Sequence, residues 1–253
     1  MSDWILLSQP VEGVRTITLN RPEQRNALTR PMMQSCADAL VTAEADPETR
    51  AILLNSNGKA FCAGADLDGL AGEPLTKEND PGHQLLMNAA NLKKPLVIAM
   101  QGPAVGIGAT LTLNADLIYA APQASLRTAF IDLGLPPEGG ASFLLPERMG
   151  RQVAGRLLLL GETLTAAEAL ASGLISQIVA AEELQTTALA AAQTLARKPV
   201  RALATTRQLM TRAHLIDTME HEQNIFRAAM HDDEFKQAIA ALRTKFGLIQ
   251  PSH

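Results

Sequence analysis

Aromatic residues and cysteines are scarce in this chain, and their scarcity disfavours several classes of protein. Aromatics make up 3% of the 253 residues and the formal net charge is −4, which argues against a basic, aromatic-lined surface for nucleic acids. The two cysteines, Cys36 and Cys62, are too few for a disulfide framework or a zinc site. We therefore expect a cytoplasmic protein with no metal site and no nucleic-acid partner.

Long uninterrupted hydrophobic runs are absent as well. Residues 95–119 carry a single charge, Asp116, and are long enough to span a membrane, but glycines, prolines and polar side chains interrupt them. Residues 1–4 lack the basic start of a secretory signal peptide. We interpret residues 95–119 as a buried strand, a turn and a core helix, and we expect no membrane association.

Hydrophobic residues are abundant, at 47% of the sequence, which is enough for one sizeable domain, or for one domain plus a helical appendage. Apolar runs bounded by turn residues predict a hairpin and several short buried strands. The predicted strands cover residues 4–7, 14–19, 51–54, 96–100, 117–120 and 174–179. Helices are predicted to start at Thr29 and at Thr165, where Glu168 completes a capping box. Further helical patterns lie around residue 85, over 109–114 and through most of 182–246, while residues 72–81 predict a surface loop.

The segment Ala60–Leu67 is the first candidate for chemistry. An apolar strand runs into it and a short helical pattern leaves it, and its small residues leave backbone N–H groups bare at a helix start. Such a turn binds an anion, or an oxygen that becomes anionic during a reaction.

A second turn between a strand and a helix, Gly106–Thr110, has the same character. It lacks the third glycine of a dinucleotide-binding fingerprint and the acidic residue that should follow. Its glycines could serve close packing alone. Together with the first turn, however, the segment predicts a two-donor oxyanion hole made of the Ala65 and Ile107 N–H groups.

Glu138 is the candidate general base. It lies between prolines and glycines in a rigid apolar stretch, where removal of water from a carboxylate raises its pKa. A solvated loop or the first turn of a helix would give it a structural role instead. Asp132 is the competing carboxylate, and we expect it to point away from the pocket.

Through these segments the chain resembles the crotonase (enoyl-CoA hydratase/isomerase) superfamily over nearly its whole length. Gly102–Ile107 and Pro137–Gly139 are most similar to Δ3,Δ2-enoyl-CoA isomerases of the peroxisomal type and their bacterial relatives. The resemblance implies an α/β fold in which a spiral of strand-strand-helix repeats forms a core over residues 1–195. It also implies a helical region over 196–253 that serves packing and oligomerisation, as a homotrimer or a dimer of trimers.

The resemblance further implies a reaction. The family's oxyanion donors match Ala65 and Ile107. The two water-activating glutamates of hydratases match Thr110 and Phe130, so both carboxylates are missing, whereas the isomerase glutamate matches Glu138. This pattern implies that Glu138 moves a proton from C2 to C4 of a 3-enoyl-CoA and so forms the 2-enoyl-CoA.

The coenzyme A part of the substrate is implied to bind along two turns, and no separate cofactor is implied. Lys59 competes with Arg25 as the cation that attracts the phosphates. The positions that match the family's CoA-binding residues are Arg25, Ala27, Ala63, Ala65, Asp66 and Leu67.

Other interpretations stay open. A ring-expanding isomerase of the epoxyphenylacetyl-CoA type places an aspartate near the position of Glu138, and an enoyl-CoA hydratase would use the same fold. A CoA-thioester-binding protein without catalysis would not require Glu138. Elsewhere, His221 and Glu222 begin like a zinc-protease motif but lack its second histidine, so we expect no metal there.

Overall fold

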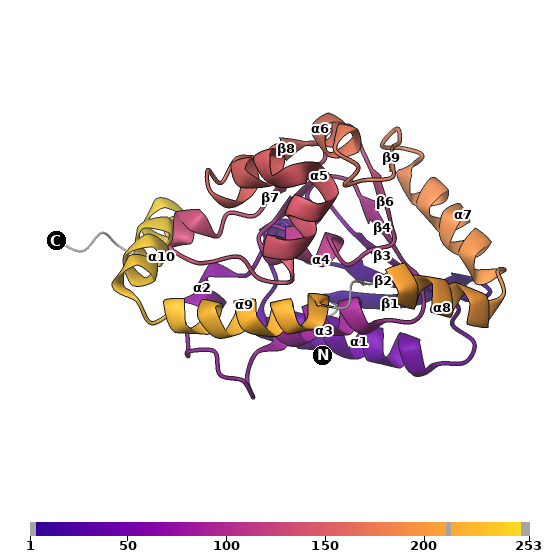
Figure 1. The fold of residues 1–253 in the computed structure, drawn as a ribbon, viewed down its shortest axis with the longest axis horizontal. Helices are drawn as coiled ribbons and strands as arrows, with labels where there is room; N and C mark the ends of the chain where they lie inside the picture. The colour runs from indigo at the N-terminus through magenta and orange to yellow at the C-terminus, as the bar shows by residue number, and fades with distance from the viewer. Residues whose placement is uncertain (1–3, 211–213, 249–253) are drawn as a thin grey trace.

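The computed structural model describes residues 4–210 and 214–248. Within these ranges a six-stranded sheet, a three-stranded sheet and the surrounding helices form an α/β fold, as predicted (Figure 1). The parts of the predicted segments at 1–3, 211–213 and 249–253 lie outside the described residues.

The larger sheet has the strand order β1-β2-β3-β4-β6-β9. The first two strands form the predicted antiparallel hairpin around Glu12 and Gly13, and each later neighbour pairs in parallel. Its strands are β1 (Ile5–Val11), β2 (Val14–Leu19), β3 (Ala51–Ser56), β4 (Leu96–Met100), β6 (Leu117–Ala120) and β9 (Gln177–Ile178).

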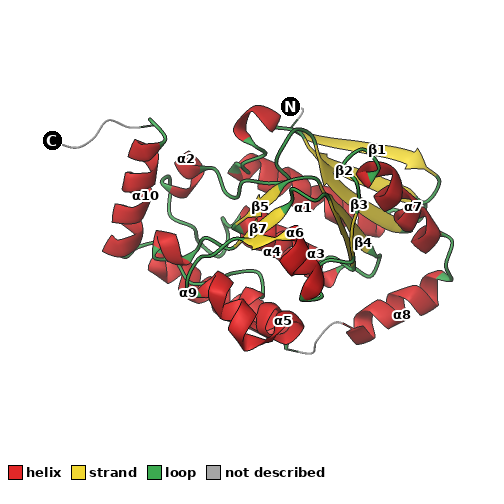
Figure 2. Ribbon diagram, turned by 90° about the horizontal axis from the view of Figure 1, so that it is seen from above, coloured by secondary structure: helices red, strands yellow, loops and turns green. Residues whose placement is uncertain are grey.

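The smaller sheet lies beside the larger one, next to helix α4 (Figure 2). Its first two strands pair in parallel and its last two antiparallel. The strands are β5 (Pro103–Val105), β7 (Ser125–Arg127) and β8 (Leu164–Thr165).

Helices surround both sheets, and they dominate the chain after Gly139, as the sequence predicts. The longer α-helices are α1 (Arg30–Ala45), α3 (Pro81–Asn91), α5 (Ala141–Leu158), α7 (Leu184–Ala196), α8 (Val200–Met210), α9 (Leu215–Ala229) and α10 (Asp233–Lys245). The shorter helices are α2 (Leu67–Leu70), α4 (Ile107–Thr112), α6 (Ala166–Ala171) and the 3₁₀ turns η1 (Pro22–Gln24) and η2 (Ile131–Leu133).

Both faces of the inner strands β3 and β4 are buried, which explains why these strands read as largely apolar runs. In β3, Ile52 and Leu54 face the cluster that contains α1 and α3 residues, while Ala51 and Leu53 face the cluster that contains α7. Side chains alternate between the two faces of a strand, so a strand covered on both sides carries apolar residues at successive positions. Helix α7 covers one face from the right-hand end of Figure 1. The edge strand β1 is mostly exposed.

Several local predictions are confirmed, and others need correction. Thr29 caps α1, and Thr165 with Glu168 forms the capping box of α6. The predicted strand over 174–179 is wrong in extent, because the strand comprises Gln177–Ile178 and the apolar residues before it pack into the core instead. The helix predicted over 109–114 begins two residues earlier, since Gly106 ends the strand and starts the helix. Residues 71–80 form a loop without regular structure.

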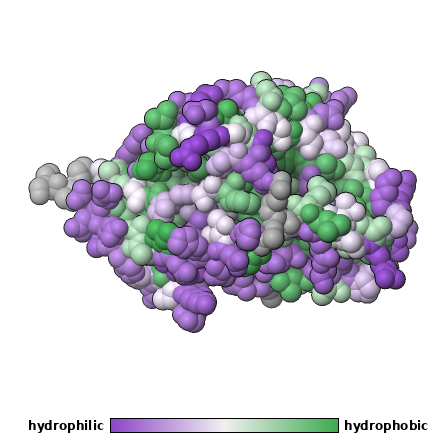
Figure 3. Space-filling view, viewed as in Figure 1, coloured by the Kyte–Doolittle hydropathy of each residue, from purple (hydrophilic) through white to green (hydrophobic). Residues whose placement is uncertain are grey.

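The C-terminal helices pack on the rest of the same chain. Helix α9 contacts α3 and α5, and α10 contacts α2 and η2 at the opposite end of the molecule from α7 (Figure 1). The division of the chain at residue 195 and a role of this region in oligomerisation stay predictions. In the described ranges, none of the helices is long and apolar enough to cross a membrane. Hydrophilic and hydrophobic residues are interspersed on the face drawn in Figure 3.

Candidate active site

The first candidate turn, Ala60–Leu67, connects β3 to α2 and is bonded directly to β5. Cys62 N–H donates to the Pro103 carbonyl at 3.1 Å, and Val105 N–H donates to the Cys62 carbonyl at 2.9 Å. Gly64 has a φ of +98°, and a Cβ at this position would lie 3.1 Å from the Val105 carbonyl oxygen. The close approach of the two segments therefore requires glycine at position 64.

The second candidate turn lies against the first. Gly106 has φ 52° and ψ −125°, and a Cβ on it would lie 4.0 Å from the Gly64 Cα. Ile107 is the first residue of α4, so its N–H has no acceptor within the helix. In the described part of the chain, neither the Ile107 nor the Ala65 N–H donates a hydrogen bond. Two free backbone donors thus lie on adjacent turns, which is what the predicted oxyanion hole requires.

Glu138 lies on the turn between η2 and α5. Its side chain is 6% exposed and has no hydrogen bond or ion pair within residues 4–210 and 214–248. Gly139 follows with a φ of +69°, and a Cβ there would lie 3.0 Å from both Leu86 Cδ1 and Thr110 Cβ. The turn is therefore pressed against α3 and α4, as the proline- and glycine-rich sequence predicts.

The surroundings of Glu138 disfavour its charged form. Burial raises its pKa to about 8, and the charges of Asp80 and Glu222 add to this effect. Asp80 is held by the far end of the chain, since its Oδ2 accepts from Gln223 Nε2 at 2.7 Å and from Arg227 Nε at 2.9 Å. A carboxylate with a pKa near neutrality suits proton transfer in both directions.

One cavity of about 730 Å³ brings the candidate residues together. Its volume falls in the range of small-molecule sites. Phe130 and Asp132 line it, but Thr110 does not. The predicted residues that line it are Arg25, Ala27, Ala63, Ala65, Asp66, Leu67, Ile107 and Glu138, which is the whole predicted set.

Asp132, the competing carboxylate, is among the residues that line the cavity. The expectation that its side chain points away from the pocket stays a prediction. Its carboxylate lies 2.7 Å from Arg127 Nη2, and both side chains are more than 40% exposed, at 46% and 43%. Asp132 is thus exposed and engaged in an ion pair, whereas Glu138 is buried and unpaired.

The loop before α1 forms one wall of the cavity and carries Arg25. Arg25 and Asn26 adopt left-handed conformations, with φ of 52° and 56°. The Asn26 side chain stabilises them, because its Nδ2 donates to the Asn57 and Ala60 carbonyls. Lys59, the alternative cation, is not among the residues that line this cavity.

Sequence reasoning missed a cation at this wall, Arg21. Its Nη1 lies 2.7 Å from Asp66 Oδ2 and also donates to the Ala27 carbonyl. Asp66 in addition caps α2 through its other oxygen. The Asp66 carboxylate is therefore engaged within the protein. Its backbone is engaged as well, because its N–H donates to the Leu28 carbonyl at 2.9 Å and its carbonyl accepts from Leu70 N–H at 3.0 Å.

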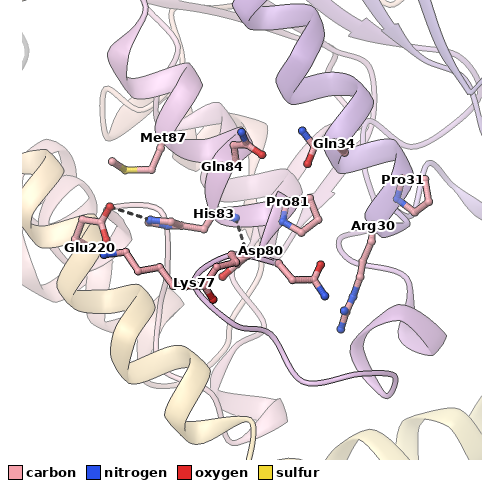
Figure 4. Close-up of a pocket in the computed structure, with 12 residues that line it drawn as sticks. Arg30, Pro31, Gln34, Lys77, Asp80, Pro81, His83, Gln84, Met87 and Glu220 are labelled. Atoms are coloured by element: carbon pink, nitrogen blue, oxygen red, sulfur yellow. Dashed lines mark hydrogen bonds and ion pairs between the residues drawn. The ribbon is translucent and has the colours of Figure 1, made fainter.

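A second cavity of about 530 Å³ lies between α1, α3 and α9 (Figure 4). His83 Nε2 on α3 lies 3.3 Å from Glu220 Oε1 on α9, and polar side chains form most of the rim. Asp80 and Pro81 line both cavities, but Glu138 and the two free N–H groups belong to the larger one. The larger cavity is therefore the candidate active site.

Free backbone donors beside a buried carboxylate define a class of enzyme that forms and protonates enolates. Comparison with known proteins identifies the family. The enoyl-CoA hydratase/isomerase family profile matches residues 10–246, and the chain belongs to this family.

Individual relatives extend over almost the whole chain. A 1,2-epoxyphenylacetyl-CoA isomerase of Escherichia coli K12 is 36% identical over 250 residues, which are 95% of each protein. A probable enoyl-CoA hydratase of Mycobacterium leprae is 32% identical over 244 residues, again 95% of each. The crystal structure of an enoyl-CoA hydratase/isomerase from Pseudoalteromonas atlantica matches with a TM-score of 0.90 at 31% identity, covering 99% of both chains. The protein is thus an enzyme of the crotonase superfamily that acts on a CoA thioester as an isomerase or a hydratase.

Proposed function

We propose that the protein is a Δ3,Δ2-enoyl-CoA isomerase with Glu138 as its single acid and base. The observation that carries this proposal is the state of Glu138: buried, unpaired, with a raised pKa, and in one cavity with two free backbone donors. An enzyme that only shifts a double bond needs one group that accepts a proton and returns it.

The proposed reaction begins with the thioester oxygen of a 3-enoyl-CoA between the Ala65 and Ile107 N–H groups. Glu138 removes a proton from C2, and the electron pair of that C–H bond becomes part of a dienolate whose charge rests on the thioester oxygen. The protonated Glu138 then returns the proton to C4, which leaves the 2-enoyl-CoA. Backbone donors of this kind contribute about 10²–10³ in rate each.

The two hydratase positions argue against hydration as the main activity. Thr110 is fully buried, and its hydroxyl donates to the Ile107 carbonyl at 3.3 Å. The Phe130 ring packs edge-on against Phe226 at 6.2 Å between centroids. Neither residue offers a carboxylate that could activate water.

Coenzyme A is proposed to bind along the loop at Arg25 and Ala27 and along the turn Ala63–Leu67, with no cofactor other than the substrate's own CoA. A homotrimer or a dimer of trimers, in a cytoplasmic setting, completes the proposal. The proposed CoA-binding positions Arg25, Ala27 and Ala63–Leu67 all line the larger cavity.

A second candidate is a ring-expanding acyl-CoA isomerase. The 36% identity to a 1,2-epoxyphenylacetyl-CoA isomerase over nearly the whole chain favours it. It would use the same enolate chemistry on a cyclic substrate.

Three substrates separate the candidates: trans-3-hexenoyl-CoA, a 2-enoyl-CoA in water, and an epoxyphenylacetyl-CoA. We expect isomerisation of the first, with loss of roughly 10³-fold or more in Glu138→Gln while acyl-CoA binding is kept. Hydration of the second without isomerisation of the first would reject the proposal. Retained isomerisation in Glu138→Gln would move the base to another residue, with Asp132 tested next.

A further inference from the structure

Helix α9 brings a second carboxylate to the backbone beside Glu138. Glu222 Oε2 accepts a hydrogen bond from Gly140 N–H at 2.6 Å, and its Oε1 accepts one from Ser142 N–H at 2.8 Å. Gly140 is the N-cap of α5 and has no side chain to cap the helix, so these N–H groups lack partners within it. A residue 82 positions away thus supplies the cap.

The contact joins two rigid parts of the molecule. Gly140 has a φ of +81°, and a Cβ on it would lie 2.6 Å from Leu215 Cδ1 of α9. Helix α9 is in turn fixed to the start of α3 by the Asp80–Arg227 ion pair, whose side chains are 3% and 10% exposed. The turn that carries Glu138 therefore depends on α9 for its polar contacts on this side.

We propose that Glu222 is a positioning residue of the reaction proposed above: its carboxylate fixes the turn that presents Glu138 to the cavity and keeps a negative charge beside that base. The inference rests on the proposed function for its substrate, but the geometry of Glu222 and Glu138 does not depend on that choice. Nothing in the sequence motif around His221 and Glu222 suggests this role.

The charged groups around Glu138 come from α3 and α9. Asp80 at the start of α3 and Glu222 on α9 both raise the pKa of Glu138, after the larger effect of burial. Arg227 pairs with Asp80, and the charge of His221 acts on Glu222. Both oxygens of Glu222 accept N–H bonds, which suits its ionised form, although burial raises its own pKa.

Two substitutions test the charge of Glu222 and the length of its side chain separately. Glu222→Gln removes the charge and one of the two acceptors, while Glu222→Asp keeps the charge but shortens the side chain by one methylene. Glu220→Gln is the matched control, because Glu220 lies on the same helix and pairs with His83, away from the 138–142 turn. All three are measured as full-length protein after a thermal-unfolding check.

The first readout is the pH profile of kcat/KM for 3-hexenoyl-CoA, whose acid limb reports ionisation of the base in the free enzyme. In Glu222→Gln we expect the limb to move down by about one pH unit and kcat to fall roughly 10–100-fold. In Glu222→Asp the limb stays in place and kcat falls, and Glu220→Gln changes neither. A loss of stability alone would lower kcat without moving the limb.

The second readout does not need turnover, so it remains if 3-enoyl-CoA proves not to be the substrate. NMR spectra of protein labelled with carbon-13 at the glutamate carboxyls follow the titration directly. The Glu138 resonance is assigned as the one that is missing from the spectrum of Glu138→Gln. Its midpoint should fall by about one pH unit in Glu222→Gln. Equal midpoints in wild type and Glu222→Gln, or the same shift in Glu220→Gln, would overturn the proposal. If Glu222→Gln does not fold, an unchanged kcat in Glu222→Asp would overturn it.

Discussion

Replacement of Glu138 by glutamine should stabilise the protein at alkaline pH while it abolishes the proposed reaction. The pKa of Glu138 is about 8 in the folded chain, against an ordinary value of 4.5. Between these two values the folded chain holds a proton that the unfolded chain has released, so the free energy of unfolding falls as the pH rises. At about 1.36 kcal/mol per pKa unit, the loss reaches at most roughly 5 kcal/mol. Glutamine is close in shape and has no proton to release, so the variant escapes this loss.

Guanidinium unfolding of wild type and Glu138→Gln, at one protein concentration, measures this difference. We expect equal unfolding free energies near about pH 4.5 and a more stable variant above about pH 8. Titratable groups that do not interact with Glu138 contribute equally to both proteins and cancel in the comparison. If the free energies of unfolding of wild type and Glu138→Gln instead differ by the same amount at every pH in this range, Glu138 is ionised in the folded protein. The inference that burial raises the pKa of Glu138 would then be refuted.

Further predictions concern packing and charge around the site. Gly108→Ala should destabilise the protein by about 1–3 kcal/mol in denaturant unfolding, since its Cβ would lie 2.6 Å from Cys62 Cβ. Gly155→Ala on α5 should not, because its Cβ would meet only Leu159 Cδ1, at 4.0 Å. Arg227→Met should cost about 3 kcal/mol or more, because it leaves the buried Asp80 without its ion-pair partner, and the same unfolding assay measures it. The Cys62 thiol, buried and with its pKa raised to about 12, should react with a thiol reagent after unfolding and not before.

The parts of the site that could be predicted from sequence are those built by local backbone geometry. Ala65 and Ile107 each lie where glycines fix a turn between a strand and a helix, and Glu138 lies where prolines and glycines fix the turn between η2 and α5. Such turns are visible in the sequence. The prediction of a raised pKa for Glu138 is confirmed, because an apolar stretch that buries its backbone also buries its carboxylate.

The parts that could not be predicted depend on contacts between distant segments. Asp80 and Arg227 are separated by 147 positions, and no local pattern indicates that they pair. Cations such as Arg21 also look like ordinary loop residues until the fold brings them to the cavity wall.

Backbone groups and side chains have different roles in the proposed site: the backbone supplies the oxyanion donors, and the side chains distinguish isomerisation from hydration. The donors at Ala65 and Ile107 are main-chain groups, so the side chain at either position is free to vary without loss of the N–H. The reaction is instead selected by which side chains face those donors. Here Thr110 lies against Gly139, and Phe130 packs against Phe226, so neither position that matches a hydratase glutamate carries a carboxylate. A buried, unpaired carboxylate in one cavity with two backbone donors therefore supports the proposal that the enzyme transfers a proton within the substrate and does not add water to it.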